Sequence, residues 1–469
     1  MKNMTVLAIQ VEEHEIKNNI IYVNPKLISQ LNLPLQKPFS ISFGNKKTEV
    51  MVRVSSNFSH LLRIPSSIAT KLLIPNGLQI HARYDTAEGL KLGPILGILV
   101  QHIDSSHPQA PFGKLTTFCE EISMVSKSKG LLTYVFTMKD INKQTQSVTG
   151  WVLKDKHWLK HIFPIPNVVY NRISSRNIEK SLKESITNLK QQYHLHFFNE
   201  HFLNKWQVYE ILKPTPIHSM MPETRYYKGI LTIKEMLVKY PILYLKPTNG
   251  ALGRGIIRIE KQNNHLFIVQ YSRSQGSITH TFHSIGQMFK HLQPRLNTEP
   301  YLVQQGLPLI QIEKRPIDFR ILTQKNKYGK WAITSMVARI ASDQHFVSNL
   351  ARGGTQSGVM KTIRLSDSVK DKKISKQRFR TLALAIAQHL EESSTGNFAE
   401  FGIDLALDTN GNVWLLEVNS KPSKTEESQL NGPRPSVMQL LKYVLFVSGF
   451  KNHLKTKIGK KRLKSGGNQ

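Results

Sequence analysis

The first ninety or so residues carry short runs in which apolar and polar positions alternate, the period of half-buried β-strands. Within them the stretch "VNPKLISQLNLP" (23–34) is echoed by "RIPSSIATKLLIP" (63–75), and each is followed by a strand-like segment, "FSISF" or "LQIHARY". Two similar turn–helix–strand units at an offset of about 40 residues are typical of an internal repeat. The pattern therefore predicts a small pseudo-symmetric β-barrel.

The pattern changes at "GPILGILV" (93–100), a turn followed by a continuous apolar strand, which is typical of the start of an α/β layer. Further strand-like segments follow, among them "GLLTYVFTM" and "PNVVYNRI" (166–173). The stretch "FFNEHFLNKWQVYEILK" (197–213) then predicts a helix that begins at Asn199. One face of this helix would carry Phe202, Trp206, Tyr209 and Leu212.

From about residue 225 onward we expect a separate α+β region, with an amphipathic helix at "KQRFRTLALAIAQHLEE" (376–392). A chain of 469 residues is too long for one core and predicts about three domains at roughly 150 residues each. We place a small β-rich domain at 1–92, an α/β domain at 93–223 and a third domain at 224–450, followed by a basic tail at 451–469. The inward positions of the amphipathic helix are Phe379, Leu382, Ile386 and Leu390.

Lysine and arginine outnumber aspartate and glutamate by 64 to 32, which gives a formal charge of +32. An excess of this size attracts polyanions of any kind, such as nucleic acid, acidic polysaccharide or an anionic lipid surface, without choosing among them. The last nineteen residues hold seven Lys or Arg and no acid. We expect a disordered tail that binds an anionic polymer or serves solubility alone.

Cys119 is the single cysteine, which excludes an intramolecular disulfide and a cysteine-based zinc cluster and fits a reducing compartment. No run of about 18 apolar residues is present, and the opening "MKNMTVLAIQVEEHE" turns acidic too early for a signal peptide. We therefore expect a cytoplasmic protein with no transmembrane segment.

The stretch "YLKPTNGALGRGIIRIE" (244–260) predicts two strands joined by a glycine-rich loop. Successive backbone N–H groups in such a loop form an anion-binding concavity, and the missing Cβ atoms let phosphate oxygens approach. Lys246 stands at its mouth, and Gly250, Gly253 and Gly255 lie within it. A plain tight turn is the alternative, and by itself the commoner one.

The stretch "FGIDLALDTNGNVWLLEVNSKP" (401–422) places Asn-Gly, the strongest short hairpin signal, between two alternating apolar runs. If Asn410 and Gly411 form the whole loop, residues whose numbers sum to 821 stand opposite one another, which pairs Asp404 with Glu417. Asn419 shares their face of the sheet. A longer loop such as "DTNGN" would shift this register. The opposite, apolar face would carry Ile403, Leu405, Leu407, Trp414, Leu416 and Val418.

Two carboxylates directly opposite one another destabilise a sheet unless a cation lies between them. The small residues Gly402 and Ala406 would leave room on this face. Two carboxylates and an amide oxygen are an incomplete shell of hard ligands, which suits Mg²⁺ completed by phosphate oxygens and water. The sequence therefore predicts a magnesium site made by Asp404, Glu417 and Asn419, with an exposed polar face as the alternative.

A glycine-rich loop followed about 150 residues later by an Asp, Glu-x-Asn hairpin resembles the ATP-grasp superfamily. The resemblance implies two α+β subdomains that grip ATP, preceded by an α/β pre-grasp domain, with ATP and Mg²⁺ as ligands. It implies that Lys205 and Lys246 hold the α- and β-phosphates. The stretch "EPYLVQQGLPL" (299–309) resembles the strand whose backbone binds adenine, with Gln304, Gln305 and Leu307 at the hinge.

The segments "RPIDFRILTQ", "SMVARIA" and "VSNLARGGT" resemble ligases of the glutamate-adding type. By this resemblance Arg320, Arg339 and Asn349 would be catalytic residues, and the two arginines would stabilise the developing charge and an acyl phosphate. A salt bridge to Asp318 or another acid is the alternative for Arg320, and Arg339 has a similar structural alternative. The barrel repeat that runs on to "EGLKLG" resembles double-psi barrels, with a purely structural role as the alternative.

Nearly the whole chain, through "LGPILGIL", "PFGKL", "FPIPNVVYNRISSR", "FNEHFLNKW" and "NLARGGT", is similar to the YheC/YheD group of endospore coat-associated ATP-grasp proteins. The resemblance implies a ligase that joins a carboxylate to an amine or a thiol, acting in the cytoplasm or at the spore coat on unidentified substrates. Two other functions stay open. One is an ATP-binding coat component without chemistry, and the other is a polyanion-binding module that uses the barrel and tail.

Overall fold

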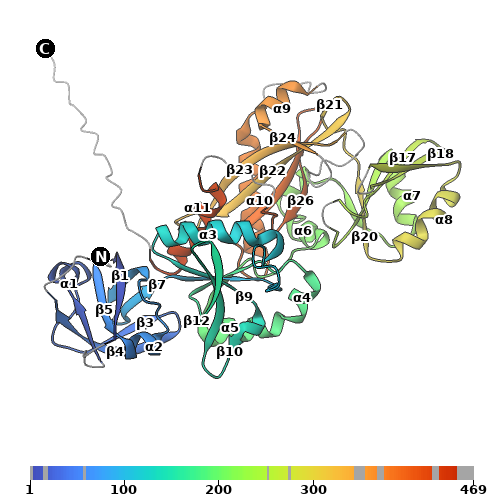
Figure 1. The fold of residues 1–469 in the computed structure, drawn as a ribbon. Coiled ribbons are helices and arrows are strands. Elements are labelled where there is room, and N and C mark those ends of the chain that lie inside the picture. Colours follow the sequence, from blue (N-terminus) through green and yellow to red (C-terminus); the bar gives the residue numbers. More distant parts are fainter. Residues whose placement is uncertain are drawn as a thin grey trace, which may run out of the picture.

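The computed structural model describes residues 4–13, 19–55, 60–250, 253–272, 276–342, 354–366, 374–424 and 432–450. These residues form one closed barrel and three open sheets. Figure 1 shows the barrel at one end of the molecule and, at the other end, the sheet whose strands flank the glycine-rich loop of residues 248–255. The two further sheets lie between them. No helix in these ranges is long and apolar enough to cross a membrane.

The predicted amino-terminal barrel is confirmed, and its strands close in the order β1-β5-β2-β4-β3-β7-β6. The helices of the two repeat units end in the same way. Each is followed by a residue in the left-handed conformation, Asn32 in one unit and Leu73 in the other. The elements are β1 (Met4–Glu12), β2 (Ile20–Val23), α1 (Pro25–Leu31), β3 (Phe39–Phe43), β4 (Lys46–Val54), β5 (Leu61–Pro65), α2 (Ser66–Leu72), β6 (Gln79–Asp85) and β7 (Gly89–Gly93).

The next sheet is an α/β layer with the strand order β10-β11-β9-β8-β13-β14, and β12 pairs with β11. Strands β9, β8, β13 and β14 run parallel to one another, so their carboxyl ends meet at one edge of the sheet. The elements are β8 (Ile95–Leu99), α3 (Thr116–Ser128), β9 (Leu132–Phe136), β10 (Ile141–Asn142), β11 (Ser147–Lys154), β12 (His157–Pro164), β13 (Val168–Asn171), α4 (Arg176–Ser181), α5 (Lys183–Tyr193) and β14 (His196–Phe198).

The helix expected to begin at Asn199 begins later, as α6 (Lys205–Leu212). Asn204 caps it, since its side chain accepts from the Gln207 N–H while the Gln207 side chain accepts from the Asn204 N–H. Asn199 is instead buried in an irregular segment, where its side chain binds Glu400 and the backbone of Ala399. Phe202 therefore lies outside the helix, and Lys205 is the first helical residue.

The remaining chain forms two sheets that face each other across a cavity. The smaller lobe contains β15 (Thr224–Tyr226), α7 (Ile230–Lys239), β16 (Ile242–Pro247), β17 (Ile257–Asn263), β18 (Leu266–Ser272), β19 (Ser277–Phe282), α8 (Ile285–Leu296) and β20 (Tyr301–Gln305). The larger lobe contains β21 (Gln311–Ile312), β22 (Arg315–Lys325), β23 (Trp331–Ile340), β24 (Thr355–Ser357), α9 (Val359–Leu365), α10 (Lys376–Ser393), β25 (Glu400–Leu407), β26 (Val413–Asn419) and α11 (Pro435–Val447).

The amphipathic pattern of α10 is confirmed, because Phe379, Leu382, Ile386 and Leu390 are all buried against the larger lobe. Helix α11 packs differently. Its apolar side shares a core with α3 and the α/β layer, where Val437 and Leu441 join Phe118. The last helix therefore joins the larger lobe to the α/β layer, and Figure 1 shows α11 beside α3.

Candidate functional site

The hairpin of β25 and β26 places Asp404 opposite Glu417, as the sequence predicts, but the loop and the register that produce this pairing differ from those expected. The loop is not a two-residue turn. It spans residues 408–412, where the Asp408 N–H donates to the Asn412 carbonyl at 3.0 Å. Beyond this loop Leu405 pairs with Leu415, and the register then shifts. The extra residue of this bulge is Leu416, so the longer loop and the bulge compensate each other.

The bulge changes which apolar residues face the core. Val413 and Leu415 are buried there, whereas Trp414 and Leu416 were expected in that place. Leu416 lines the cavity instead, and the Trp414 indole donates to the Asp408 carboxylate at 2.9 Å. On the first strand Ile403, Leu405 and Leu407 point into the core, as does Val418 on the second.

The room expected beside Gly402 is occupied. A Cβ at this position would come within 2.9 Å of the Pro422 side chain and 3.5 Å of an Arg320 nitrogen. The glycine therefore allows Pro422 and Arg320 to approach the strand, and it leaves no vacant volume of its own. Ala406 pairs with Trp414 across the hairpin.

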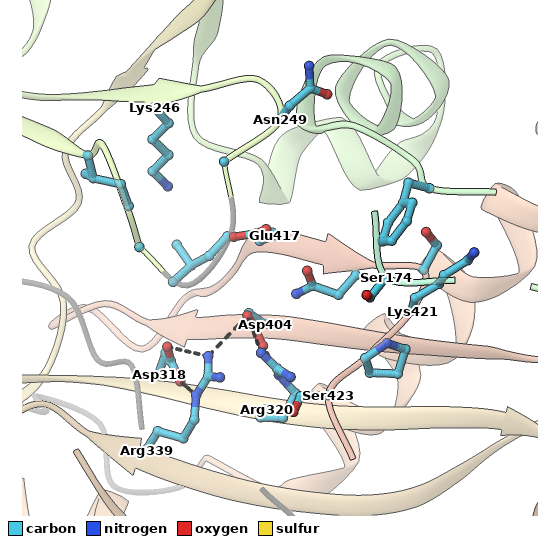
Figure 2. A pocket seen from close by; sticks show the side chains of 18 of the residues that line it. Ser174, Lys246, Asn249, Asp318, Arg320, Arg339, Asp404, Glu417, Lys421 and Ser423 are labelled. Carbon is cyan, nitrogen blue, oxygen red and sulfur yellow. Dashed lines mark hydrogen bonds and ion pairs between the residues drawn. The ribbon is translucent and has the colours of Figure 1, made fainter. Parts of the chain in front are cut away.

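Two arginines hold the Asp404 carboxylate, as Figure 2 shows. Arg320 donates from Nε to Oδ1 and from Nη2 to Oδ2, the second at 3.1 Å. Arg339 places Nη2 3.1 Å from Asp404 Oδ2 and also donates from Nε and Nη2 to Asp318, at 2.6 and 2.7 Å. The salt bridges left open as alternatives for these arginines are therefore present. One of them joins Arg320 to the predicted metal ligand itself.

This cluster is largely removed from water, since Asp404 is 6% exposed and Arg339 4%. Burial by itself would raise the pKa of Asp404, but the charges and hydrogen bonds of Arg320 and Arg339 lower it below its usual value. Removing one partner from a buried ion pair costs about 3–5 kcal/mol, because the other charge stays buried without compensation. Asp404 is therefore ionised and fixed in position.

The glycine-rich loop joins β16 and β17, which pair as predicted. Gly253 and Gly255 have φ of 67° and 73°, and a Cβ at Gly255 would meet Pro247 at 2.8 Å. Only glycine satisfies both constraints without strain. The Gly250 carbonyl accepts from Lys205 Nζ at 2.5 Å, so α6 and this loop are joined.

Two lysines stand between the glycine-rich loop and the carboxylates. Lys205 Nζ lies 3.3 Å from Glu417 Oε1. Lys246 Nζ donates to Gln304 Oε1 at 2.6 Å. The pKa of Lys246 is lowered to about 8, chiefly by burial and also by the positive charge of Lys205, while the negative charges of Glu417 and Asp404 oppose the shift. A cation held in this state gains much from an incoming phosphate.

Most of the predicted site residues line one cavity of about 1790 Å³. Lys205 lines a small adjoining pocket instead, Gly255 belongs to the glycine-rich loop without lining the cavity, and Asn349 falls outside the described residues. The cavity is lined by Lys246, Gly250, Gly253, Gln304, Gln305, Leu307, Arg320, Arg339, Asp404, Glu417 and Asn419.

The donor set fits magnesium. Asp404 accepts three N–H groups from its two arginines, whereas a carboxylate offers about four lone-pair positions, so one remains for a cation. Glu417 and Asn419 supply further oxygens, and Mg²⁺ prefers oxygen ligands. Among the described residues no group of three His, Cys, Asp or Glu side chains is close enough to hold an ion by itself. The shell would therefore be completed by phosphate oxygens and water.

The opposite wall of the cavity comes from the α/β layer, which the sequence analysis did not assign to the site. The loops that follow β8 and β13 contribute Phe112 and Ser174. Arg176, the first residue of α4, and Phe202 also line the cavity. Ligands of α/β sheets bind outside the carboxyl ends of parallel strands. The polar run "NRISSRN" directly after a buried strand was therefore a usable signal.

The chain is similar to known proteins along most of its length. The chain is 28% identical over 397 residues to the endospore coat-associated protein YheD of Bacillus subtilis (strain 168), and the match covers 83% of this chain and 86% of the relative. It is 24% identical over 312 residues to the endospore coat-associated protein YheC of the same organism, covering 66% and 85%.

Solved structures resemble the chain more distantly. The match to the D-Ala:D-Ser ligase VanG from Enterococcus faecalis covers 76% of this chain and 99% of the ligase, with a TM-score of 0.45 and 10% identity. The match to D-alanyl-alanine synthetase A from Vibrio cholerae O1 biovar eltor covers 76% and 99%, with a TM-score of 0.42 and 13% identity.

The family profile described as YheC/D like ATP-grasp matches residues 194–447, which is more than half of the chain. This range holds the lysine of α6, the glycine-rich loop and the carboxylate hairpin. The chain belongs to the YheC/D-like ATP-grasp family.

Proposed function

We propose that the protein is a Mg-ATP-dependent ligase that joins a carboxylate to an amine, or to a thiol, through an acyl phosphate. The observation that supports this most is the pairing of Asp404 with Glu417 on one cavity wall, beside Lys205 and Lys246. Phosphoryl transfer needs positioned cations and metal ligands more than covalent chemistry. This set of side chains supplies both.

The nucleotide would lie between the two lobes. Lys205 and Lys246 would bind its phosphates under the glycine-rich loop, and the hinge near Leu307 would hold the base. Asp404, Glu417 and Asn419 would hold Mg²⁺, which when bound neutralises the charge that develops on the transferring phosphoryl group.

The two arginines would have different roles. Arg320 is the more exposed, at 17% of its side chain against 4% for Arg339. We assign Arg320 to the developing negative charge of the acyl phosphate, because it is the more exposed of the two arginines and lies beside Asp404. Arg339 is held by Asp318 through both Nε and Nη2 and would position Asp404.

The reaction would proceed in two steps. An oxygen of the substrate carboxylate attacks the γ-phosphorus of ATP, the bond from this phosphorus to the β–γ bridging oxygen breaks, and ADP leaves. An amine then attacks the acyl carbon, loses a proton to solvent, and phosphate leaves. A thiol would react in the same way and give a thioester.

The printed names of the two relatives describe them as endospore coat-associated. We propose the same association for this chain, as a cytoplasmic protein that acts at the forming coat. The basic tail, residues 451–469, lies outside the described residues, and its binding to an anionic polymer stays a prediction.

The test is release of ADP and phosphate by the purified protein, screened against pools of amino acids, peptides and spore-coat extract. A ligase releases both products only with Mg²⁺ and with a pool that contains its substrates, and Glu417→Gln lowers the release. If wild type binds Mg-ATP but no pool raises ADP release above that of the Glu417→Gln variant, the chain is an ATP-binding component without turnover.

A further inference from the structure

The cavity is larger than one nucleotide site requires. Pockets for drug-sized ligands measure about 300–1,000 Å³, whereas this cavity measures about 1790 Å³. Its inner surface extends from the glycine-rich loop to Ser174, in the loop after β13, and to Arg176, the first residue of α4. A second ligand therefore has room between the carboxylate hairpin and the α/β layer.

Arg176 is fixed on this wall by two contacts. Its Nη2 donates to the Leu203 carbonyl at 3.2 Å, and its guanidinium stacks over the Phe202 ring at 4.7 Å from the centroid. Lys421 Nζ lies over the same ring at 4.6 Å. Phe202 therefore supports two cations, and a planar guanidinium held on a ring is well oriented for recognition.

The carboxylate of Glu179, on the same helix as Arg176, already accepts hydrogen bonds from other groups. Glu179 accepts from Lys421 Nζ, from Asn171 Nδ2 at 3.0 Å and from the Phe202 N–H at 2.8 Å. Within the described ranges Arg176 has no carboxylate at ion-pair distance, and its hydrogen-bond partner is a backbone carbonyl. Since a guanidinium carries five N–H donors, most of its capacity remains for a ligand.

We propose that Arg176 binds a substrate at a subsite formed with Phe202 and Ser174. The group that it binds is a carboxylate that takes no part in the reaction. This inference rests on the proposed ligase function, because it names a feature of that ligase's substrate. The carboxylate belongs either to an amine acceptor, such as an amino acid or peptide, or to a donor with a second acid group. An anionic ligand is the common chemistry of both.

The electrostatics of the wall support this subsite. Burial lowers the pKa of Arg176, and the negative charges of Glu179 and Glu417 oppose that shift. Arg176 is therefore near enough to the predicted metal site to interact electrostatically with Glu417. Lys421 also donates to the Ile173 carbonyl, next to Ser174, and Figure 2 shows Ser174 and Lys421 together beside the strand of Glu417.

The experiment is calorimetric titration of two carboxylate probes into the full chain with Mg²⁺ and a non-hydrolysable ATP analogue. Glutarate represents the donor with a second acid group, and the dipeptide alanyl-alanine represents the acceptor. The amide controls are glutaramate, in which an amide replaces one carboxylate of glutarate, and alanyl-alaninamide, in which an amide replaces the carboxylate of the dipeptide. We expect one of the two acids to bind at least tenfold tighter than its amide.

Arg176→Gln should lower the affinity for that acid by about tenfold. Arg176→Lys should lower it by less, because lysine keeps the charge and loses the planar fork. Lys180→Gln is the matched control, since it removes the same charge from an exposed position on the same helix. Equal binding of acid and amide, or equal loss in the Arg176→Gln and Lys180→Gln variants, would overturn the subsite. Titration of the nucleotide analogue alone reports separately on the proposed function.

Discussion

We predict that Lys246 makes the affinity for Mg-ATP dependent on pH. With a pKa of about 8, its amine is about 0.9 protonated at pH 7 and about 0.1 at pH 9. If the phosphates bind only the ammonium form, the dissociation constant rises about tenfold over this range. The phosphates themselves keep a constant charge, because their last ionisation lies near pH 6.

The assay is the dissociation constant for Mg-ATP between pH 7 and pH 9 at fixed ionic strength, without the second substrate. Lys421 also titrates near pH 8, because burial lowers its pKa to about 8. The variant Lys246→Arg separates the two groups, since a guanidinium stays charged throughout. We expect a tenfold weakening in wild type and a nearly flat profile in Lys246→Arg.

Two outcomes would refute this reasoning. A flat wild-type profile would mean that Lys246 is ionised throughout or does not contact the phosphates. An equal slope in wild type and Lys246→Arg would assign the titration to another group, with Lys421, which lies over the Phe202 ring, as the first candidate.

Three further predictions concern the carboxylate hairpin. Glu417→Gln should weaken ATP binding about tenfold in Mg²⁺ and less than twofold in its absence, and equal weakening would show that Glu417 is no metal ligand. Arg320→Lys should lower turnover about 100-fold while ATP affinity changes less than threefold, with Arg315→Lys on the same strand as the control, and loss of ATP binding would make Arg320 a nucleotide or structural residue. Asp408→Ala should lower the free energy of unfolding by about 3 kcal/mol in denaturant titrations, since its carboxylate accepts from two backbone N–H groups and from the side chains of Asn412 and Trp414, and an unchanged value would mean that the loop does not depend on it.

Local patterns predicted much of the fold, because side-chain periodicity reflects which face of an element is buried. The repeated barrel unit and the buried face of α10 follow from such patterns. The start of α6 was placed too early. Asn199 and Asn204 are both acceptable caps by type, and only the reciprocal bonds of Asn204 with Gln207 and the burial of Asn199 against Glu400 decide between them.

The carboxylate pair was predicted, but the geometry that produces it was not. The Asn-Gly signal in "DTNGN" competes with Asp408, whose carboxylate organises a five-residue loop. A bulge at Leu416 then restores the register, and bulges have no clear sequence signature here. The run "NRISSRN" could have indicated a ligand-binding edge at the end of β13, but its position opposite the carboxylate hairpin depends on how the α/β layer meets the larger lobe. That contact is tertiary, and local periodicity does not encode it.

The central claim is that a substrate carboxylate is activated by the γ-phosphate of ATP at the hairpin of Asp404 and Glu417. Its most direct test uses a substrate from the ADP-release screen with ¹⁸O in the carboxylate, followed by mass analysis of the phosphate released. The account predicts one ¹⁸O atom in each phosphate formed, because the acyl phosphate breaks at the acyl carbon. Phosphate free of ¹⁸O, released together with ADP and the joined product, would contradict it.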